Sequence, residues 1–177
     1  MVAFKRPNEA WCSAELSKNG FGHVAVARFK LSGDAEVGVF LVDVYCLGVK
    51  DAYFARVSEL EYNSKILAGI AETGGGKESL GPACARKLIE GAVQYAQGLG
   101  LAPHPDYKKA CRVLGGIRPE DCERTFTYGK DGKPLFVQSP NDSPEFVERV
   151  METLTRRLGK DGFHYILEAG SLGEDLE

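Results

Sequence analysis

One apolar run, VGVFLVDVYCL from Val37 to Leu47, constrains the fold of this chain more than any other segment. Successive side chains of a β-strand point to opposite faces, and in this run both faces are apolar. Such runs are typical of strands that are buried on both sides. We therefore expect this segment to be the central strand of a sheet.

Hydrophobic periodicity and turn signals predict the other elements. The expected strands are 22–31 and 163–167, with a hairpin over 124–138 that turns at Asp131-Gly132. The expected helices lie within 58–71 and at 82–98, 105–114 and 144–158. Residues 51–57 fit either a strand or a helix. Because strands and helices are partly segregated along the chain, the prediction is an α+β fold, a mixed or antiparallel sheet with three to four packed helices.

The length predicts a single compact domain. A chain of 177 residues is long enough to build a core without the support of disulfides or metals. We expect residues 1–167 to form this domain and the acidic residues 168–177 to be a frayed tail. The Gly-rich segment 73–81 is expected to be a flexible linker.

The composition predicts a soluble cytoplasmic protein. The most apolar stretch is interrupted by Asp43 and is shorter than the about 20 residues that a membrane span needs. The first residues lack the apolar core of a signal peptide. The five cysteines include no CxxC pair, so we expect free thiols in a reducing compartment.

Charge is spread evenly along the chain, and the formal net charge is −3. Neither half is basic, so the overall balance does not favour nucleic acid as the main partner, although it leaves a local basic patch open. A protein partner is expected at the exposed hairpin Lys130–Lys133 or at the strand edge beside Pro134.

No complete cofactor or catalytic motif is present. The glycines before Lys77 fail the phosphate-loop pattern GxxxxGK[ST], because Ala71 stands at the first glycine position and Glu78 at the last position. The nucleophile motif GxSxG and the dinucleotide motif GxGxxG are absent. Close pairs of cysteine or histidine, which zinc sites usually show, are absent as well, so the sequence assigns no metal and no cofactor.

Asp43 is the one charged residue within the apolar run. Burial of a carboxylate is costly unless the group is paired or lies at an exposed strand end. The simplest interpretation is therefore structural. The alternative is a catalytic or metal-binding acid that works with a second carboxylate. Candidates for the second carboxylate are Asp51, Glu59, Glu61 and Asp106.

Cys46, near the end of the same run, is the candidate nucleophile. A helix that began after Gly48 would lower the pKa of this thiol, and Lys50 would add positive charge beside it. Free cysteines are also among the most buried residues in proteins, so a structural role is the simpler interpretation.

The segment PHPDY, from Pro103 to Tyr107, places His104 and Asp106 on a proline-stiffened loop at the start of a helix. A histidine with a fixed backbone suits acid–base chemistry when a cysteine or carboxylate lies beside it. Local packing of His104 and a helix-dipole role for Asp106 are the structural alternatives. His23 and His164 lie in expected strands and are predicted to be structural.

Three functions follow from these observations. The favoured one is a small binding or regulatory domain without catalysis, because no catalytic signature is complete. The second is a thiol-dependent hydrolase or transferase, in which Cys46 attacks, His104 acts as base, and Asp106 or Asp43 orients the histidine. The third is a metal-dependent nuclease or phosphoesterase built on Asp43, which needs a local basic surface. Candidates for that surface are Lys108, Lys109, Arg112, Arg118 and Arg124.

Overall fold

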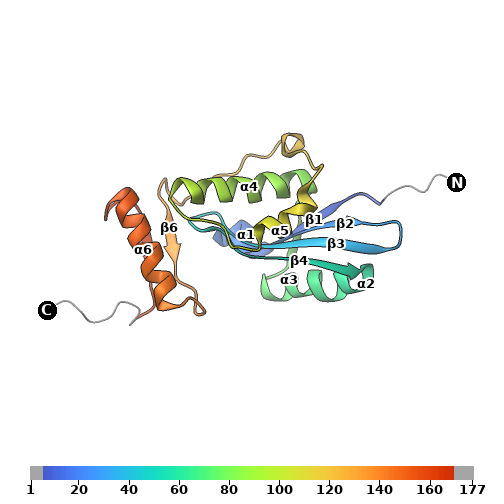
Figure 1. Ribbon diagram of the computed structural model, residues 1–177, viewed down its shortest axis with the longest axis horizontal. Coiled ribbons are helices and arrows are strands. Elements are labelled where there is room, and N and C mark those ends of the chain that lie inside the picture. Colours follow the sequence, from blue (N-terminus) through green and yellow to red (C-terminus); the bar gives the residue numbers. More distant parts are fainter. Residues whose placement is uncertain (1–5, 170–177) are drawn as a thin grey trace.

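Five antiparallel strands form the main sheet, in the spatial order β4-β3-β2-β1-β5 (Figure 1). The computed structural model describes residues 6–169. The strands are β1 (Glu9–Ser13), β2 (Phe21–Phe29), β3 (Asp34–Asp43), β4 (Gly48–Ser58) and β5 (Lys77–Ser79). Most connections between neighbours are short, which is why the sheet is antiparallel.

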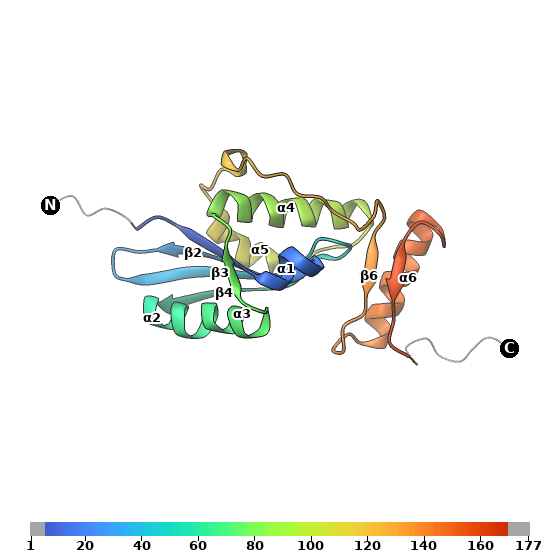
Figure 2. The same ribbon diagram turned by 180° about the vertical axis from the view of Figure 1, so that it is seen from behind.

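Helices cover both faces of this sheet (Figures 1 and 2). One face carries α4 (Pro82–Gly98), α5 (Tyr107–Ala110) and the 3₁₀ turn η2 (Cys111–Leu114). The other face carries a continuous helical segment made of α2 (Glu59–Glu61), the π-helical turn η1 (Tyr62–Leu67) and α3 (Ala68–Thr73). Two short elements complete the body, α1 (Ala14–Asn19) and the 3₁₀ turn η3 (Pro119–Asp121).

The alternation of side chains along β2 and β3 divides the core into two layers. Val24 and Phe40 point toward α4, whereas Ala25 and Val39 pack on η1 and α3. All four residues are buried. This arrangement confirms the expectation that the apolar run is covered on both sides, and it gives an α+β fold in a single compact domain.

The position and end of the predicted central strand differ from expectation. The middle strand of the sheet is β2, with β3 beside it, and β3 ends at Asp43 instead of Leu47. The chain leaves the sheet there because the Asp43 carboxylate accepts hydrogen bonds from the next backbone N–H groups and closes a turn. Gly48 then starts β4 with a φ of 72°, a conformation that favours glycine.

Residues 51–57, which fit either a strand or a helix, belong to β4 and are a strand. Several local signals at helix starts are confirmed. Ser58 and Glu61 form the capping box at the start of α2. Pro82 and Pro144 occupy first-turn positions of α4 and α6, and the Ser143 hydroxyl caps α6.

The predicted hairpin over 124–138 is wrong. Asp131 and Gly132 do form a tight turn with positive φ, bridged by Lys130 and Lys133, but residues 124–128 are not a strand. The following strand β6 (Leu135–Val137) instead pairs in parallel with β7 (His164–Ile166), after the chain has passed through α6 (Pro144–Leu158). β6 therefore pairs with a strand that is distant in the sequence, and not with residues 124–128.

The Gly-rich segment is also more ordered than a linker. Within residues 73–81, β5 adds a strand to the edge of the sheet by pairing with β1. Sequence analysis missed both strands because β1 is short and β5 is polar and exposed. Of the predicted tail, residues 170–177 lie outside the described part of the chain.

The expectation of five free thiols is wrong for Cys84 and Cys122, which form a disulfide. Cys84 lies in the first turn of α4 and Cys122 follows η3, so the bond ties the loop after η2 to the helix. Cys12, Cys46 and Cys111 are free. Among the described residues, no helix is long and apolar enough to cross a membrane.

Candidate functional site

A cleft of about 690 Å³ opens where the end of the main sheet meets α6. Figure 2 shows α6 and β6 grouped beside that end of the sheet, away from the N-terminal end of the molecule. The walls are the start of β4, the loop 100–105 and the first turns of α6. The cleft thus lies between three segments, 47–50, 100–105 and 141–153, that are far apart in the sequence.

Lys50 is placed in this cleft by an irregularity in β4. Leu41 pairs with Asp51 and Val42 with Val49, so Lys50 has no partner on β3. Such bulges turn a side chain away from the regular alternation of a strand. The Lys50 ammonium lies 2.7 Å from the Asp142 carboxylate and donates a hydrogen bond of 2.8 Å to the Ser139 hydroxyl.

Asp142 is fixed by the loop that precedes α6. Its Oδ2 accepts a hydrogen bond from the Ser139 backbone N–H, and its own N–H donates to the Ser139 carbonyl. The next residue, Ser143, caps α6 by accepting from the Phe146 N–H. The ion pair with Lys50 therefore connects this cap to β4. The Asp142 side chain is only 6% exposed, so the pair is well shielded from water.

His104 contributes an imidazole to the opposite wall. Its backbone N–H donates to the Val49 carbonyl, which ties the proline loop to β4. Its Nδ1 accepts a hydrogen bond of 3.1 Å from the Asp106 backbone N–H, so the neutral ring carries its hydrogen on Nε2. That Nε2 lies 3.6 Å from the Asp51 carboxylate. The side chain is one-third exposed and accessible from the cleft.

The remaining lining combines one further cation with apolar side chains. Arg149 comes from the second turn of α6, and its guanidinium lies 5.8 Å from the centre of the Phe146 ring. The Lys50 ammonium is 5.9 Å from the same ring. Apolar lining is provided by Leu47, Val49, Leu101, Ala102, Pro103, Pro105, Phe146 and Val150. With two cations and one carboxylate, the cleft carries a net positive charge.

Asp43 lies outside this cleft, at the end of β3, where its carboxylate closes the turn to β4. Its carboxylate accepts hydrogen bonds from the backbone N–H groups of Tyr45, Cys46 and Leu47, at 2.8, 3.2 and 3.1 Å. Burial raises the pKa of this carboxyl to about 6, because desolvation outweighs the three hydrogen bonds that favour the charged form. Its oxygens are already used by the turn, which is a structural arrangement.

Cys46 lies in the same turn and is fully buried. It packs in the apolar cluster between the main sheet and α6, with Phe136 and Leu154. Desolvation raises the pKa of the thiol well above its usual range, and the nearby Asp43 carboxylate adds to the effect. A nucleophilic cysteine needs the opposite environment, because the thiolate is the reactive form.

The structure therefore brings one of the four predicted site residues into the cleft. His104 lines it, and Asp106 supports His104 through its backbone N–H. Cys46 and Asp43 lie in the neighbouring turn and do not line the cleft. In the described part of the chain, no three side chains of His, Cys, Asp or Glu are grouped so that they could hold a metal ion.

Sequence analysis missed Asp142 and Arg149. The loop QSPNDSP has the composition of a turn that precedes a helix, but nothing in it indicates that Asp142 meets Lys50. Comparison of the chain with protein-family models, with curated proteins and with solved structures found no match. The function must therefore be inferred from the geometry of the cleft.

Proposed function

We propose that this protein is a binding domain whose cleft takes a small anionic ligand with an apolar part. The observation that carries the proposal is the lining of the cleft, where Lys50 and Arg149 stand over a largely apolar floor. Small-molecule sites typically combine an apolar lining with a few well-placed polar groups, and volumes of about 300–1,000 Å³ are usual.

Lys50 retains binding capacity although it is paired. An ammonium group has three N–H donors, and two of them face Asp142 and Ser139. The third is free to bind a carboxylate or phosphate oxygen of a ligand. The two existing bonds also hold the ammonium in place, so less side-chain entropy is lost when the ligand binds.

Arg149 and His104 complete the polar contacts that we assign to the ligand. Within the described residues, the Arg149 guanidinium has no acidic partner, so it is available for a paired, two-oxygen contact with an anion. The His104 Nε2–H adds a third donor on the opposite wall. The apolar body of the ligand would then contact Phe146 and the two prolines of the loop.

The test is a binding titration followed by backbone NMR with three matched probes: benzoate, phenyl phosphate and neutral benzamide. We expect millimolar or tighter binding of the two anions, with shifts confined to the start of β4, the loop 100–105 and the first turns of α6. Arg149→Met should weaken binding of the anions about tenfold, since a charge-assisted contact is lost. Arg156→Met, on the same helix, is the matched control.

Two outcomes contradict the proposal. One is benzamide binding as tightly as benzoate, because the cations would then have no role. The other is the absence of shifts in the cleft with either anion at millimolar concentration. The thiol-enzyme and metal-enzyme hypotheses have less support, because Cys46 is buried in an apolar cluster and the Asp43 oxygens close a turn.

We also propose a cytoplasmic location, which the disulfide between Cys84 and Cys122 tests most directly. Disulfides are rare in reducing compartments. Alkylation of the protein in intact cells, followed by mass spectrometry, reports the state of this pair. Reduced Cys84 and Cys122 agree with the cytoplasm, whereas a quantitatively formed bond contradicts the proposed location.

A further inference from the structure

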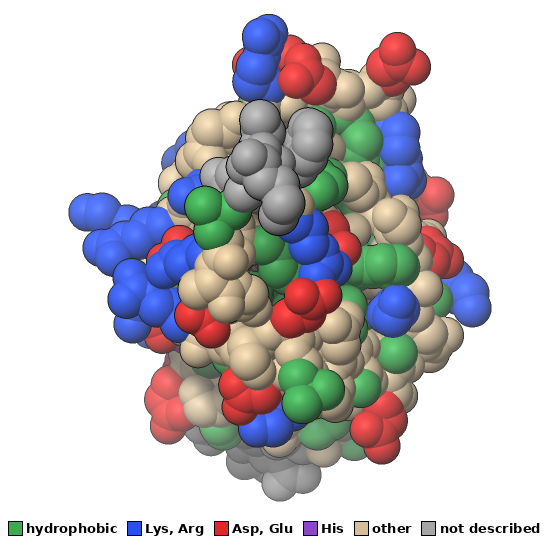
Figure 3. Space-filling model, turned by 90° about the vertical axis from the view of Figure 1, so that its right-hand side faces the viewer, with side chains coloured by type: hydrophobic (Ala, Val, Ile, Leu, Met, Phe, Trp, Pro, Cys, Tyr) green, Lys and Arg blue, Asp and Glu red, His purple; other side chains and the backbone are tan. Residues whose placement is uncertain are grey.

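Lysine and arginine side chains gather on one flank of the molecule, at the left edge of the view in Figure 3. We call this surface the basic flank. It is formed by α5 and η2 together with the adjoining ends of β2 and β4. Its residues are Arg28, Lys30, Arg56, Lys108, Lys109 and Arg112.

One carboxylate, that of Glu36, binds two of these cations, Lys30 and Arg56. Arg28, Glu36 and Arg56 are direct neighbours across β2, β3 and β4, so their side chains emerge on the same face. The Glu36 carboxylate accepts from Lys30 at 3.0 Å and from Arg56 at 3.2 Å. These contacts lower the pKa of Glu36, so the group is charged at neutral pH and partly balances two of the cations.

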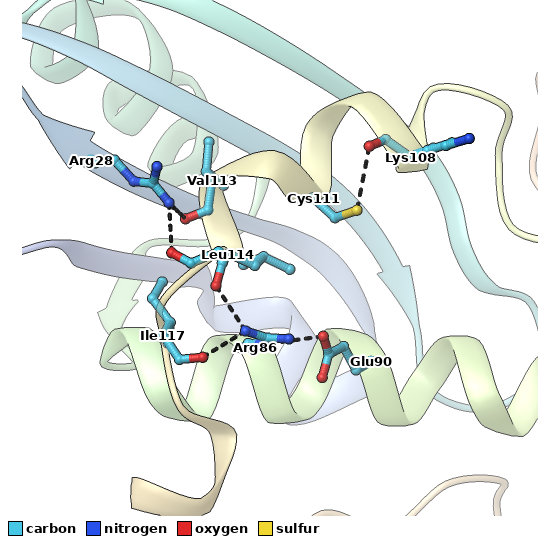
Figure 4. Close-up of polar contacts among 9 residues, drawn as sticks. Arg28, Arg86, Glu90, Lys108, Cys111, Val113, Leu114 and Ile117 are labelled. Atoms are coloured by element: carbon cyan, nitrogen blue, oxygen red, sulfur yellow. Dashed lines mark hydrogen bonds and ion pairs between the residues drawn. The ribbon is translucent and has the colours of Figure 1, made fainter.

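The other three cations, Lys108, Lys109 and Arg112, come from α5 and η2. The half-buried side chains of Arg28 on β2 and Arg86 on α4 hold this segment in place (Figure 4). Arg28 donates to the carbonyls of Arg112, Val113 and Gly115. Arg86 donates to those of Leu114 and Ile117, at 3.0 and 2.6 Å. Because the backbone carbonyls are satisfied in this way, the exposed side of this segment has a defined position.

The balance of charge on the basic flank is strongly positive. Lys108, Lys109 and Arg112 are exposed, and none of them has an acidic partner within residues 6–169. Arg118, by contrast, lies beside Glu120 and Asp121, and these carboxylates balance its charge. Within residues 6–169, Glu36 is the one carboxylate that forms an ion pair with any of the six cations, although the formal net charge of the chain is −3.

From this concentration of charge we propose that the basic flank binds the phosphate backbone of a nucleic acid duplex, without reading the base sequence. Arginine and lysine contacts to phosphates provide affinity and no sequence information. A single strand would need exposed aromatic rings for stacking. On this flank, Tyr107 and Phe54 are only partly exposed, and Arg56 lies 5.8 Å from the Phe54 ring.

A lipid surface fits this flank less well. Peripheral membrane helices insert an apolar face beside their basic residues. Here the apolar residues of α5 and η2, among them Ala110, Val113 and Leu114, are buried against the sheet, and the residues that α5 exposes are charged. The basic flank is also separate from the cleft, since none of its six residues lines it.

The experiment is a fluorescence-anisotropy titration of the full chain against a short labelled DNA duplex at several salt concentrations. We expect binding at low salt that weakens steeply as salt rises, with a log–log slope of about −0.9 for each phosphate contacted. The variant with Lys108→Glu, Lys109→Glu and Arg112→Glu should lose at least about tenfold in affinity and show a shallower slope.

The matched control carries the same change of charge elsewhere: Lys18→Glu, Lys65→Glu and Lys160→Glu. All six substitutions are at exposed positions, and thermal unfolding verifies that both triple variants fold. A third variant, with Lys108→Arg and Lys109→Arg, should retain binding. Equal losses in both triple variants would overturn the proposal, because the effect would then be one of net charge.

Three other results would also overturn it. One is the absence of binding by the unmodified protein at low salt. Another is binding to vesicles that contain phosphatidylserine without binding to the duplex, which would assign the flank to a membrane. The third is tighter binding of a single strand than of the duplex. Failure of the cleft to bind benzoate would leave these outcomes unchanged, because the two surfaces share no residue.

Discussion

The Lys50 ammonium and the Asp142 carboxylate lie 2.7 Å apart, and this ion pair joins the first residues of β4 to the loop that begins α6. Both side chains are largely shielded, at 14% and 6% exposure. Water and salt therefore weaken the attraction between these two charges less than they do in a surface ion pair. Both residues line the candidate cleft, so the pair connects two segments of its wall.

Removal of one partner should destabilise the protein. Asp142→Ala leaves a shielded ammonium without its counter-ion, and the loss is expected to be on the order of 3 kcal/mol. Asp142→Asn tests the charge alone, since the amide can still bond to Ser139. Urea unfolding gives the free energy of unfolding of both variants.

The double variant Lys50→Met and Asp142→Leu provides the control for this prediction. Replacement of both charges by apolar groups should recover much of the stability, because no charge is then left unpaired. It should not recover binding of an anion in the cleft. If either single variant is as stable as the unmodified chain, the pair has no structural role.

The free cysteines should differ in their reaction with iodoacetamide. Cys46 is fully buried and its thiol pKa is raised by desolvation, whereas Cys111 is partly exposed in η2. We therefore expect Cys111 to be alkylated first and Cys46 to be nearly inert in the folded protein at pH 6. Mass spectrometry of the labelled peptides resolves the sites. If Cys46 is alkylated first and His104→Ala slows its alkylation, the thiol-enzyme hypothesis is favoured.

Loss of the disulfide should lower stability without changing the sheet. The bond closes a loop with a sequence separation of 38, for which the chain-entropy estimate is about 4 kcal/mol. Cys122→Ser should therefore unfold at lower urea, as should the unmodified protein with dithiothreitol. Cys111→Ser serves as control, and because it leaves the disulfide intact it should not lose this stabilisation. Arg86 and Lys87 still hold the same loop by hydrogen bonds to its carbonyls, so the variant should fold.

Sequence patterns predicted most elements whose signals are local. Ser58 with Glu61, Pro82 and Ser143 each mark a helix start that depends only on neighbouring residues, and all three are confirmed. The apolar run also predicted a strand buried on both sides. In these cases, the free energy that determines the element comes from residues within one turn or one strand.

Elements that depend on distant partners could not be predicted in this way. Residues 135–137 find their partner in β7 beyond α6, so the local hairpin signal was misleading. The polar strand β5 exists because β1 leaves an open edge. The cleft also depends on contacts between distant segments. Lys50 faces the cleft because of a bulge in β4, and Asp142 meets Lys50 only when α6 packs on Leu47 and Leu99. No spacing in the sequence encodes these contacts.

Asp43 should make the stability of the protein depend on pH. Its carboxyl has a pKa of about 6 in the folded protein, above the ordinary value of 3.8, because burial disfavours the charge. Between these pH values the folded state binds more protons than the unfolded state, so stability falls as pH rises. The loss is complete above pH 6 and amounts to about 3 kcal/mol, from about 1.4 kcal/mol for each pH unit.

The variant Asp43→Asn isolates this effect from all other titrating groups. Asparagine cannot ionise, and its carbonyl oxygen can still accept from the N–H groups of Tyr45 and Cys46, whereas its amide nitrogen meets the Leu47 N–H and loses that bond. Urea unfolding of both proteins from pH 4 to pH 7 gives the difference in their free energies of unfolding. We expect the advantage of the unmodified chain to shrink as pH rises through this range, because the protonated carboxyl is the stabilising form. A difference that stays constant with pH would mean that the hydrogen bonds of the turn offset the desolvation of the carboxylate.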